Sequence, residues 1–342
     1  MFQSWTCTAS CATNLEIRST LSTSDKKDYI SAVQCIQSKP SITPHKLAPG
    51  VRSRYDDFVA THINQTMTIH GTGNFLAWHR YFTWAYEKAL RDECGYRGYQ
   101  PQYWAWGKYA FDPLSSPIFD GSNTSMSGNG AYQKHTPIGV PSSINPDITI
   151  PPAAGGGCVD SGPFKDFVVN LGPVAAVMDD VPTNPQTDGL GYNPRCLRRD
   201  INEWVSSSFT KDSDTASLIL ENPDFYWFST LMQGNFSAGI MGVHTGGHMT
   251  INGDPGGDLF VSPGDPAFYL HHSMIDRVWW IWQNQDIAKR TYAISGTITL
   301  DDLPPSRNTT LNDTMDLGVN AETMTLHDAM STIAGPFCYI YV

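Results

Sequence analysis

The sequence has few basic residues and no long apolar run, and each deficit excludes a class of function. Its 342 residues include 22 Lys and Arg against 33 Asp and Glu, which gives a net charge of -11. A chain this acidic repels phosphates, so we expect no nucleic acid among its partners. No stretch approaches the roughly 18–20 apolar residues that span a bilayer, so we expect no membrane partner either.

Cysteine pairs of the C-x-x-C type are also absent, which argues against a zinc-finger fold. The seven cysteines are instead scattered along the chain, as in secreted proteins that form disulfides. Five N-x-S/T glycosylation sequons agree with this, at Asn64, Asn123, Asn235, Asn308 and Asn312. We therefore predict a secreted, extracellular glycoprotein in which most cysteines are paired.

Helical patterns dominate the chain, and no linker divides it. We predict one domain over residues 1–342 that is mainly α, with long irregular loops and a few short strands. Residues 111–163 are irregular and rich in Gly, Pro and Ser, and β-like pieces follow Thr297. The predicted helices, the first of them capped by Ser24, cover residues 24–37, 53–69, 75–91, 195–209, 221–234, 236–251 and 266–285.

Seven of the 10 histidines lie in two short stretches. In the later stretch His244 and His248 are four residues apart, so on a helix their Cβ atoms share one face, about 5–6 Å apart. That separation suits two imidazoles that bind one metal. A loop rich in Gly, Pro and Asp follows, and His271 and His272 lie early in the next predicted helix.

The earlier stretch holds His62, His70 and His79. One straight helix would separate His62 from His70 by about 12 Å along its axis, which is too far for two ligands of one metal. We therefore expect His70 beyond the helix end, where Gly71 and Gly73 break the pattern, and His79 on a new helix. Each stretch then offers two helices and three histidines, and two such sites facing each other make a dinuclear centre.

The choice of metal depends on what accompanies the histidines. Zinc hydrolases usually combine His with carboxylates, whereas all-imidazole ligation suits copper, zinc or iron. Two facing three-histidine sites without a bridging carboxylate favour copper, so we expect two copper ions per chain. The other histidines, His45, His135 and His327, have no such neighbours, and we expect them at the surface or in structural hydrogen bonds.

The motifs WHRYFTWAYEKAL and DPAFYLHHSMIDRVWWIWQ strongly resemble those of the type-3 copper proteins, which are the tyrosinases, catechol oxidases and molluscan haemocyanin units. The resemblance covers residues 53–92 and 225–286, and Arg18, Tyr339 and Tyr341 match the motifs at the two ends of the family's core domain. It implies a central four-helix bundle that holds the dinuclear copper site. The chain looks most like a short secreted fungal polyphenol oxidase that lacks the C-terminal lid domain of longer latent forms.

The resemblance also implies the ligands of each copper ion. The first copper would take His62, His70 and His79, and the second would take His244, His248 and His272. Spacing alone leaves His271 and His272 open, because adjacent residues point about 100° apart on a helix. The family uses the second of the pair, with an aromatic residue four positions earlier over the site, and Phe268 matches that residue.

Three positions depart from the family pattern. Many fungal tyrosinases have a cysteine two residues before the second ligand, bonded to a histidine carbon; here Thr68 takes its place, so that thioether is absent. Monophenol hydroxylation is often associated with Asn after the fourth ligand, where this chain has Thr245. It is also associated with an upstream Glu that holds a water. Gln233 or Asn235 stands there; we prefer Gln233, and an amide is a poor base.

The resemblance leads us to expect a catechol oxidase, which oxidises o-diphenols to o-quinones while dioxygen is reduced to water. Phe268, Thr245 and Met249 would shape substrate entry. The partners would be dioxygen and small phenols, and we expect a monomer. The alternatives are a tyrosinase with true monophenol hydroxylation, an o-aminophenol oxidase, a haemocyanin-like oxygen carrier and a dinuclear zinc hydrolase.

A secreted protein of this kind is expected to have a disulfide framework. The predicted pairs are Cys35 with Cys94, Cys158 with Cys196, and Cys338 with Cys7 or Cys11. One thiol is then left over. Each disulfide would contribute about 2–4 kcal/mol, mainly by restricting the unfolded chain.

Overall fold

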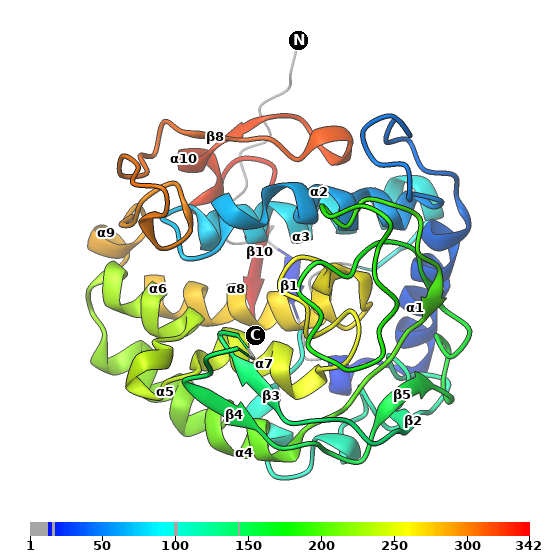
Figure 1. Cartoon of the computed structure of the whole chain (residues 1–342). Helices are drawn as coiled ribbons and strands as arrows, with labels where there is room; N and C mark the ends of the chain where they lie inside the picture. The colour runs from blue at the N-terminus through cyan, green and yellow to red at the C-terminus, as the bar shows by residue number, and fades with distance from the viewer. Residues whose placement is uncertain (1–12, 16–17, 99–101, 143) are drawn as a thin grey trace.

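Helices and irregular loops make up most of the protein (Figure 1). A computed structural model describes residues 13–15, 18–98, 102–142 and 144–342. The α-helices are α1 Thr23–Ser38, α2 Arg54–Ile69, α3 Phe75–Cys94, α4 Glu203–Phe209, α5 Asp212–Glu221, α6 Phe225–Gln233, α7 Gly242–Ile251, α8 Phe268–Asn284, α9 Ile287–Arg290 and α10 Leu326–Ala329. The prediction of a mainly α protein with long loops and a few short strands is confirmed.

The strands are short and pair only in twos. They are β1 Thr13–Leu15, β2 Gly130–Tyr132, β3 Ile138–Val140, β4 Ile148–Ile150, β5 Gly156–Val159, β6 Val168–Val169, β7 Arg195–Cys196, β8 Thr314–Met315, β9 Met324–Thr325 and β10 Tyr339–Tyr341. β1 pairs with β10 in parallel, whereas β2 with β5, β3 with β4, β6 with β7, and β8 with β9 are antiparallel. Two-stranded ribbons are marginal by themselves, so these depend on packing against the rest of the chain.

The ends of α2 are set by local sequence. Ser53 and Asp56 form a capping box at its start, in which each side chain accepts a hydrogen bond from the other residue's backbone N–H. The helix stops at Ile69, and His70 follows in an extended conformation with φ -122° and ψ 145°. Gly71 then turns the chain with a φ of +58°, which favours glycine. The prediction that His70 lies beyond the helix end is confirmed.

The helix predicted over residues 195–209 is wrong in its first half. That half contains β7, and α4 begins only at Glu203, where Asn202 caps it. The preceding segment is held extended by backbone bridges from Arg198 to Cys158 and to Asp254. In addition, Arg199 donates two hydrogen bonds of 2.7 Å to Asp265. A local pattern does not show such distant partners.

Three further helix starts differ from prediction. The helix expected over 221–234 begins only at Phe225, where Asp224 caps it. The helix expected over 236–251 begins only at Gly242, because Gly239 and Gly242 both have a φ of +72° and interrupt the turn. The first helix is capped by Ser22 rather than Ser24. α5 lies in a stretch where no helix was predicted.

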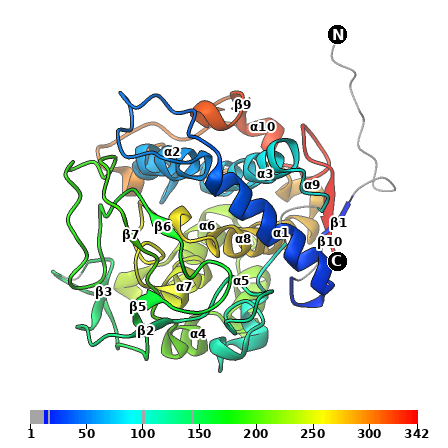
Figure 2. The same cartoon turned by 90° about the vertical axis from the view of Figure 1, so that its right-hand side faces the viewer.

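Two pairs of helices from distant parts of the chain lie together. In Figure 1, α2 and α3 lie above α7 and α8, and α3 packs directly against α8. The side view in Figure 2 shows α1 crossing in front of this arrangement, where it packs against α2 and α3. The two histidine-rich stretches of the sequence are thereby brought to one place in the interior.

The two ends of the chain close over this core. β1 and β10 pair with each other, and the hydroxyls of Tyr339 and Tyr341 donate to the Asp276 carboxylate at 2.6 and 2.7 Å. Burial raises the pKa of both phenols well above the usual range, so they remain neutral donors. The buried Arg18 guanidinium donates to Gln102 Oε1 at 2.6 Å. The arginine and tyrosine motifs at the chain ends therefore have a structural role.

Both disulfides predicted within the described residues are confirmed. Cys35 of α1 is bonded to Cys94 at the end of α3, and Cys158 of β5 is bonded to Cys196 of β7. Cys338 is also disulfide-bonded. The choice of its partner between Cys7 and Cys11 falls outside the described residues.

Candidate metal centre

The first histidine cluster is formed by His62 of α2, His70 just beyond that helix, and His79 of α3. All three side chains are buried, and one nitrogen from each lies within 4.8 Å of the others. The structure therefore brings together the three residues that were predicted as ligands of the first copper.

Each ring of this cluster is oriented by a backbone carbonyl. The Nδ1 atoms contact Phe260 O at 2.8 Å for His62, Thr66 O at 3.0 Å for His70, and Phe75 O at 2.8 Å for His79. A carbonyl oxygen only accepts hydrogen bonds, so each Nδ1 carries the proton. Each Nε2 is left with its lone pair, and such outer contacts are typical of histidines that bind metals.

The second cluster has closely spaced ring nitrogens. His248 Nε2 of α7 lies 3.2 Å from His244 Nε2 on the same helix and 3.1 Å from His272 Nε2 on α8. Metal–nitrogen bonds of about 2.0–2.1 Å in a tetrahedral site imply nitrogen separations of about 3.3 Å. The observed spacing therefore suits one metal ion bound by these rings.

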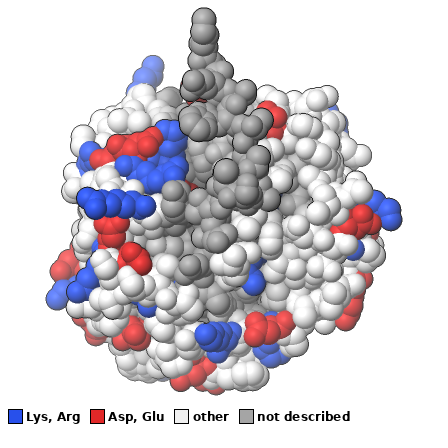
Figure 3. All heavy atoms as spheres, turned by 180° about the vertical axis from the view of Figure 1, so that it is seen from behind, with Lys and Arg blue, Asp and Glu red and all other residues white. Residues whose placement is uncertain are grey.

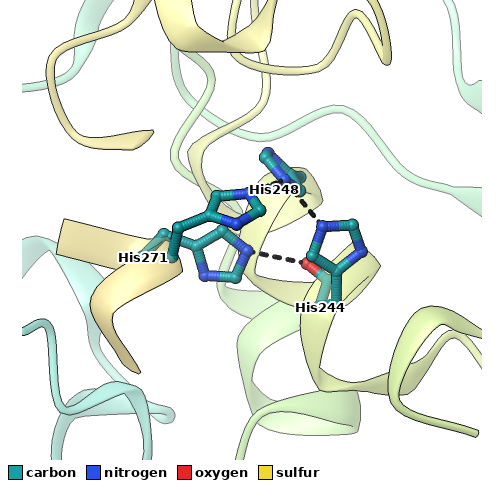
Figure 4. Close-up of side chains that lie close together, drawn as sticks. His244, His248 and His271 are labelled. Carbon is teal, nitrogen blue, oxygen red and sulfur yellow. Dashed lines mark hydrogen bonds between the residues drawn. The ribbon is translucent and has the colours of Figure 1, made fainter. Parts of the chain in front are cut away.

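The neighbouring His271 has a different partner. Its Nε2 lies 3.0 Å from the backbone carbonyl of His244, to which it must donate (Figure 4). Its ring also fills the space beside Gly247, where an added Cβ would lie 2.2 Å from a His271 ring carbon. This contact with the backbone favours His272 over His271 as the third ligand of the second copper.

The two clusters face each other across a short distance. The rings of His79 and His272 stack with their centroids 4.5 Å apart and their planes at 17°. One residue beyond His79, Arg80 Nε donates to Asp276 Oδ1 at 2.6 Å, which ties α3 to α8. The arrangement is that of a dinuclear centre built from two separate stretches of sequence.

Burial sets the protonation of these rings. Desolvation is the largest cause that lowers the pKa of all seven histidines, to about 4 for His70 and about 3 for His271. The rings are therefore neutral near pH 7, which is the form that binds metals.

The chemistry of the donors fits a pair of copper ions. The buried Nε2 atoms of His62 and His79 have no hydrogen-bond partner in the described part of the chain. Among the same residues no carboxylate joins either cluster, so the donors are imidazoles alone. Imidazole is a common ligand of copper, and an unpaired buried nitrogen is costly unless something binds it.

The predicted pocket residues lie around the clusters in different ways. Phe268 stacks on His272 with centroids 4.0 Å apart and planes at 28°, directly over the second cluster. Thr245 points its hydroxyl at the Gln233 carbonyl, 2.6 Å away. Met249 packs in a smaller apolar cluster with β3 and β4, so its role in the pocket stays a prediction.

The two candidates for the water-holding position differ in their contacts. Gln233 Oε1 accepts from the backbone N–H of Gly71 at 2.8 Å, directly beside His70. Asn235 lies past the end of α6 and forms a backbone bridge with Ile240. Gln233 is therefore the one that contacts the first cluster. Thr68 is exposed, and its hydroxyl bonds back to its own helix.

Sequence patterns could not have identified the groups that orient the rings. Phe260 contributes through its carbonyl, and any residue type has one. The nearest sequence signal is Asp258, whose carboxylate accepts from the backbone N–H groups of Phe260, Val174 and Ala175 and so fixes that loop. Asp258 is buried, and desolvation raises its pKa.

The remaining histidines lie outside the two clusters. His135 is buried and bonds Asp200 at 3.1 Å and the Thr136 carbonyl at 2.9 Å. His45 is exposed, and His327 is exposed and stacks on Tyr292. They have the surface and structural environments that were predicted for them.

Comparison with known proteins agrees with this geometry. Residues 52–285 match the common central domain of tyrosinase. The chain is 44% identical to tyrosinase P of Aspergillus terreus over 94% of its length and 89% of that protein. It is 46% identical to the tyrosinase-like protein orsC of Emericella nidulans over 84% of this chain and 79% of that one. A polyphenol oxidase variant from Thermothelomyces thermophila superimposes with a TM-score of 0.92 and 44% identity, covering 98% of this chain and 90% of that one.

The fold and the paired histidine clusters define a type-3 copper protein. The chain belongs to the tyrosinase family, whose members bind two copper ions and use dioxygen and phenolic substrates. Its function at this level is that of a copper oxidase, and the two clusters provide the sites for the cofactor.

Two observations concern the nucleic-acid and membrane partners that were considered from the sequence: the distribution of surface charge and the character of the helices. On the face shown in Figure 3, the described acidic and basic side chains lie in mixed groups among uncharged ones, without a continuous basic area. In the part of the chain that the structure describes, no helix combines the length and the apolar character needed to cross a membrane.

Proposed function

We propose that this protein is a catechol oxidase, which converts o-diphenols to o-quinones and reduces dioxygen to water. Two diphenols and one dioxygen then give two quinones and two waters. The observation that carries the proposal is the contact between Gln233 and Gly71 beside His70, since we assign this neutral amide to the position of the water-holding residue. When bound, the copper pair would accept the electrons of the substrate and pass them to dioxygen.

The residues around the first cluster support this choice of substrate. Gln233 Nε2 lies 3.3 Å from both the carbonyl and the hydroxyl of Ser229, while its Oε1 is used by Gly71. An amide does not accept a proton at neutral pH, whereas a monophenol with a pKa of about 10 must lose one before hydroxylation. Diphenols need less help from a base once they are bound to copper.

The pocket residues have roles that follow from their contacts. The buried Phe268 ring covers His272 and would exclude water from the second copper site while offering an apolar face to an aromatic ring. His62, His70 and His79 would hold the first copper, and His244, His248 and His272 the second. The backbone contacts of the first three fix which nitrogen binds.

The test is the ratio of initial rates with tyramine and dopamine, which have the same ammonium tail and differ in one hydroxyl. Native protein should oxidise dopamine far faster. The double variant Gln233→Glu with Thr245→Asn should raise the ratio, because a carboxylate can keep the Gly71 contact and also hold a basic water. General-base catalysis is worth about 10²–10⁴-fold, and an imperfectly placed water gives only part of it.

The matched control is Gln233→Met with Thr245→Asn, which removes the amide without adding a base and should leave the ratio low. A native ratio near one without a lag would overturn the proposal in favour of a tyrosinase. Reversible dioxygen binding without quinone formation would instead indicate an oxygen carrier, and stoichiometric zinc in active protein would indicate a hydrolase.

We also propose that the protein is secreted and acts as a single-domain monomer. Disulfides are typical of oxidising compartments, and five cysteines of the described chain are in disulfides. Asn64, Asn123, Asn308 and Asn312 of the five sequons are exposed. Both histidine clusters are complete within one chain. Glycan release by an amidase and light scattering of the purified protein would test these points.

A further inference from the structure

A loop that follows α9 lies beside the first histidine cluster. It is closed at its base by the bridge between Thr297 and Asn308, and the Gly73 N–H donates to the Thr297 carbonyl at 3.0 Å. In Figure 1 this orange loop lies at the left, against the end of α2. We call residues 297–308 the rim loop.

The tip of the rim loop comes very close to the residue after His70. A Cβ added to Gly71 would lie 2.8 Å from Leu300 Cδ1 and 3.0 Å from Asp301 Oδ1. The positive φ at position 71 favours glycine, and a side chain there would displace the ends of the Leu300 and Asp301 side chains. The Asp301 carboxylate consequently lies one residue away from a predicted copper ligand.

This side of the metal centre is partly open to solvent. All the clustered histidines are buried, but Gly71, Gln233 and Thr245 are each partly exposed and are linked by two hydrogen bonds. Asp301 is exposed and borders the same group. A small phenol that reaches the first copper from this side passes Asp301.

The conformation of the loop tip is unusual. Asp301 has φ 50° and ψ 29°, and Asp302 has φ 57°, so two consecutive non-glycine residues are left-handed. Left-handed residues other than glycine are uncommon, although Asp adopts this conformation more readily than most. The Asp302 carboxylate has a structural use here, because it accepts from the Ser306 N–H at 2.7 Å.

Asp301 has no comparable structural use. In the described part of the chain its carboxylate has no hydrogen bond or ion pair. The nearby basic residue of the rim loop, Arg307, is already paired with Asp313 at 2.8 and 2.9 Å. The charge that Asp301 presents beside the site is therefore not neutralised by a partner.

We propose that Asp301 is a specificity-determining residue that favours phenols with an ammonium group and disfavours phenols with a carboxylate. The inference rests on the proposed catechol oxidase function, since it concerns the substrates of that same site. The effect is electrostatic, so it should change KM and leave the turnover of a neutral catechol unaltered. Because Asp301 is exposed, the effect should be roughly 1.4- to 5-fold in kcat/KM and should weaken with salt.

The experiment compares dopamine, 4-methylcatechol and 3,4-dihydroxyphenylacetate, which are cationic, neutral and anionic catechols. Asp301→Asn keeps the size of the side chain, and Asn tolerates the left-handed conformation well. We expect the variant to lower kcat/KM for dopamine relative to 4-methylcatechol, to raise it for the anionic catechol, and to reduce the salt dependence of both ratios.

The matched control is Glu203→Gln, which removes one exposed negative charge from α4, on the opposite side of the molecule from the rim loop in Figure 1, and should change none of the ratios. Unchanged ratios in Asp301→Asn, or equal shifts in both variants, would overturn the inference while leaving the catechol oxidase function intact. If native protein makes no quinone from any of the three catechols, the proposed function itself fails. The tyramine to dopamine ratio does not respond to Asp301, because both substrates are cations.

Discussion

The two histidine clusters are similar in composition but are held in different ways. In the first cluster a backbone carbonyl fixes every ring. Among the three predicted ligands of the second copper, His248 alone has such a backbone contact in the described part of the chain, to Gly256. The buried Nδ1 atoms of His244 and His272 have no hydrogen-bond partner in the described chain.

Aromatic packing orients the second cluster where hydrogen bonds do not. Phe268 stacks on His272, and His271 lies against His244 with ring centroids 5.7 Å apart. A hydrogen bond fixes both the tautomer and the direction of the lone pair, whereas packing restricts the ring plane alone. We therefore expect the first site to be preorganised for metal and the second to be more adaptable.

The largest effect should come from removing one ligand of either cluster. His79→Ala should lose the first copper and His244→Ala the second, so each variant should hold one copper per chain and lose oxidase turnover. Metal analysis by mass spectrometry measures the first result, and oxygen uptake with a catechol measures the second. His327→Ala, an exposed histidine, should keep two coppers, and full activity in either cluster variant would show that the ligand assignment is wrong.

The buried ion pair between Arg80 and Asp276, which joins α3 to α8, should give the next largest effect when it is broken. Asp276→Asn leaves the buried Arg80 guanidinium without its anionic partner and also changes the acceptor of Tyr339 and Tyr341. Breaking a buried pair in this way typically costs about 3–5 kcal/mol. Urea unfolding of the copper-free protein measures the loss.

The control for this change is an ion pair on the surface. Asp92→Asn breaks the exposed contact with Lys88, and it should leave the unfolding midpoint almost unchanged. A similar midpoint for both variants would mean that the buried tie between α3 and α8 has no special role.

The smallest expected effect is a difference in copper affinity between the two clusters. His244→Ala keeps only the anchored first site, and His79→Ala keeps only the second. Outer contacts of metal-binding histidines are typically worth 10–100-fold in affinity, so the first site should bind copper more tightly by part of that range. Titration of each single-copper variant with a competing chelator measures both constants, and equal or reversed affinities would contradict the comparison.

Local patterns predicted most of the elements that hold the site. The capping box at Ser53 and the turn at Gly71 are local in origin, so the end of α2 and the position of His70 were predictable. The helix predicted across residue 199 was wrong, because the backbone there bridges to distant segments and Arg199 pairs with Asp265, which lies far away in the sequence. Amphipathic spacing reports which face is apolar, but not which distant charge a residue meets.

The sequence by itself determined the kind of chemistry. Seven histidines grouped in two short stretches indicate a metal site rich in imidazole, and the specific motifs around them identify the family. Side-chain type and spacing along a helix are local properties, so these conclusions needed no coordinates. The sequence also showed, without coordinates, that Gln233 and Thr245 depart from the residue pattern of the family.

Only the tertiary structure decided how the rings are aimed and what borders the site. The carbonyl of Phe260 that fixes His62, the carbonyl of His244 that occupies His271, and the approach of Asp301 to Gly71 all join residues remote in sequence. Backbone groups are the same in every residue, and loop approach depends on the packing of the whole chain. Such contacts therefore leave no signature in the order of the amino acids.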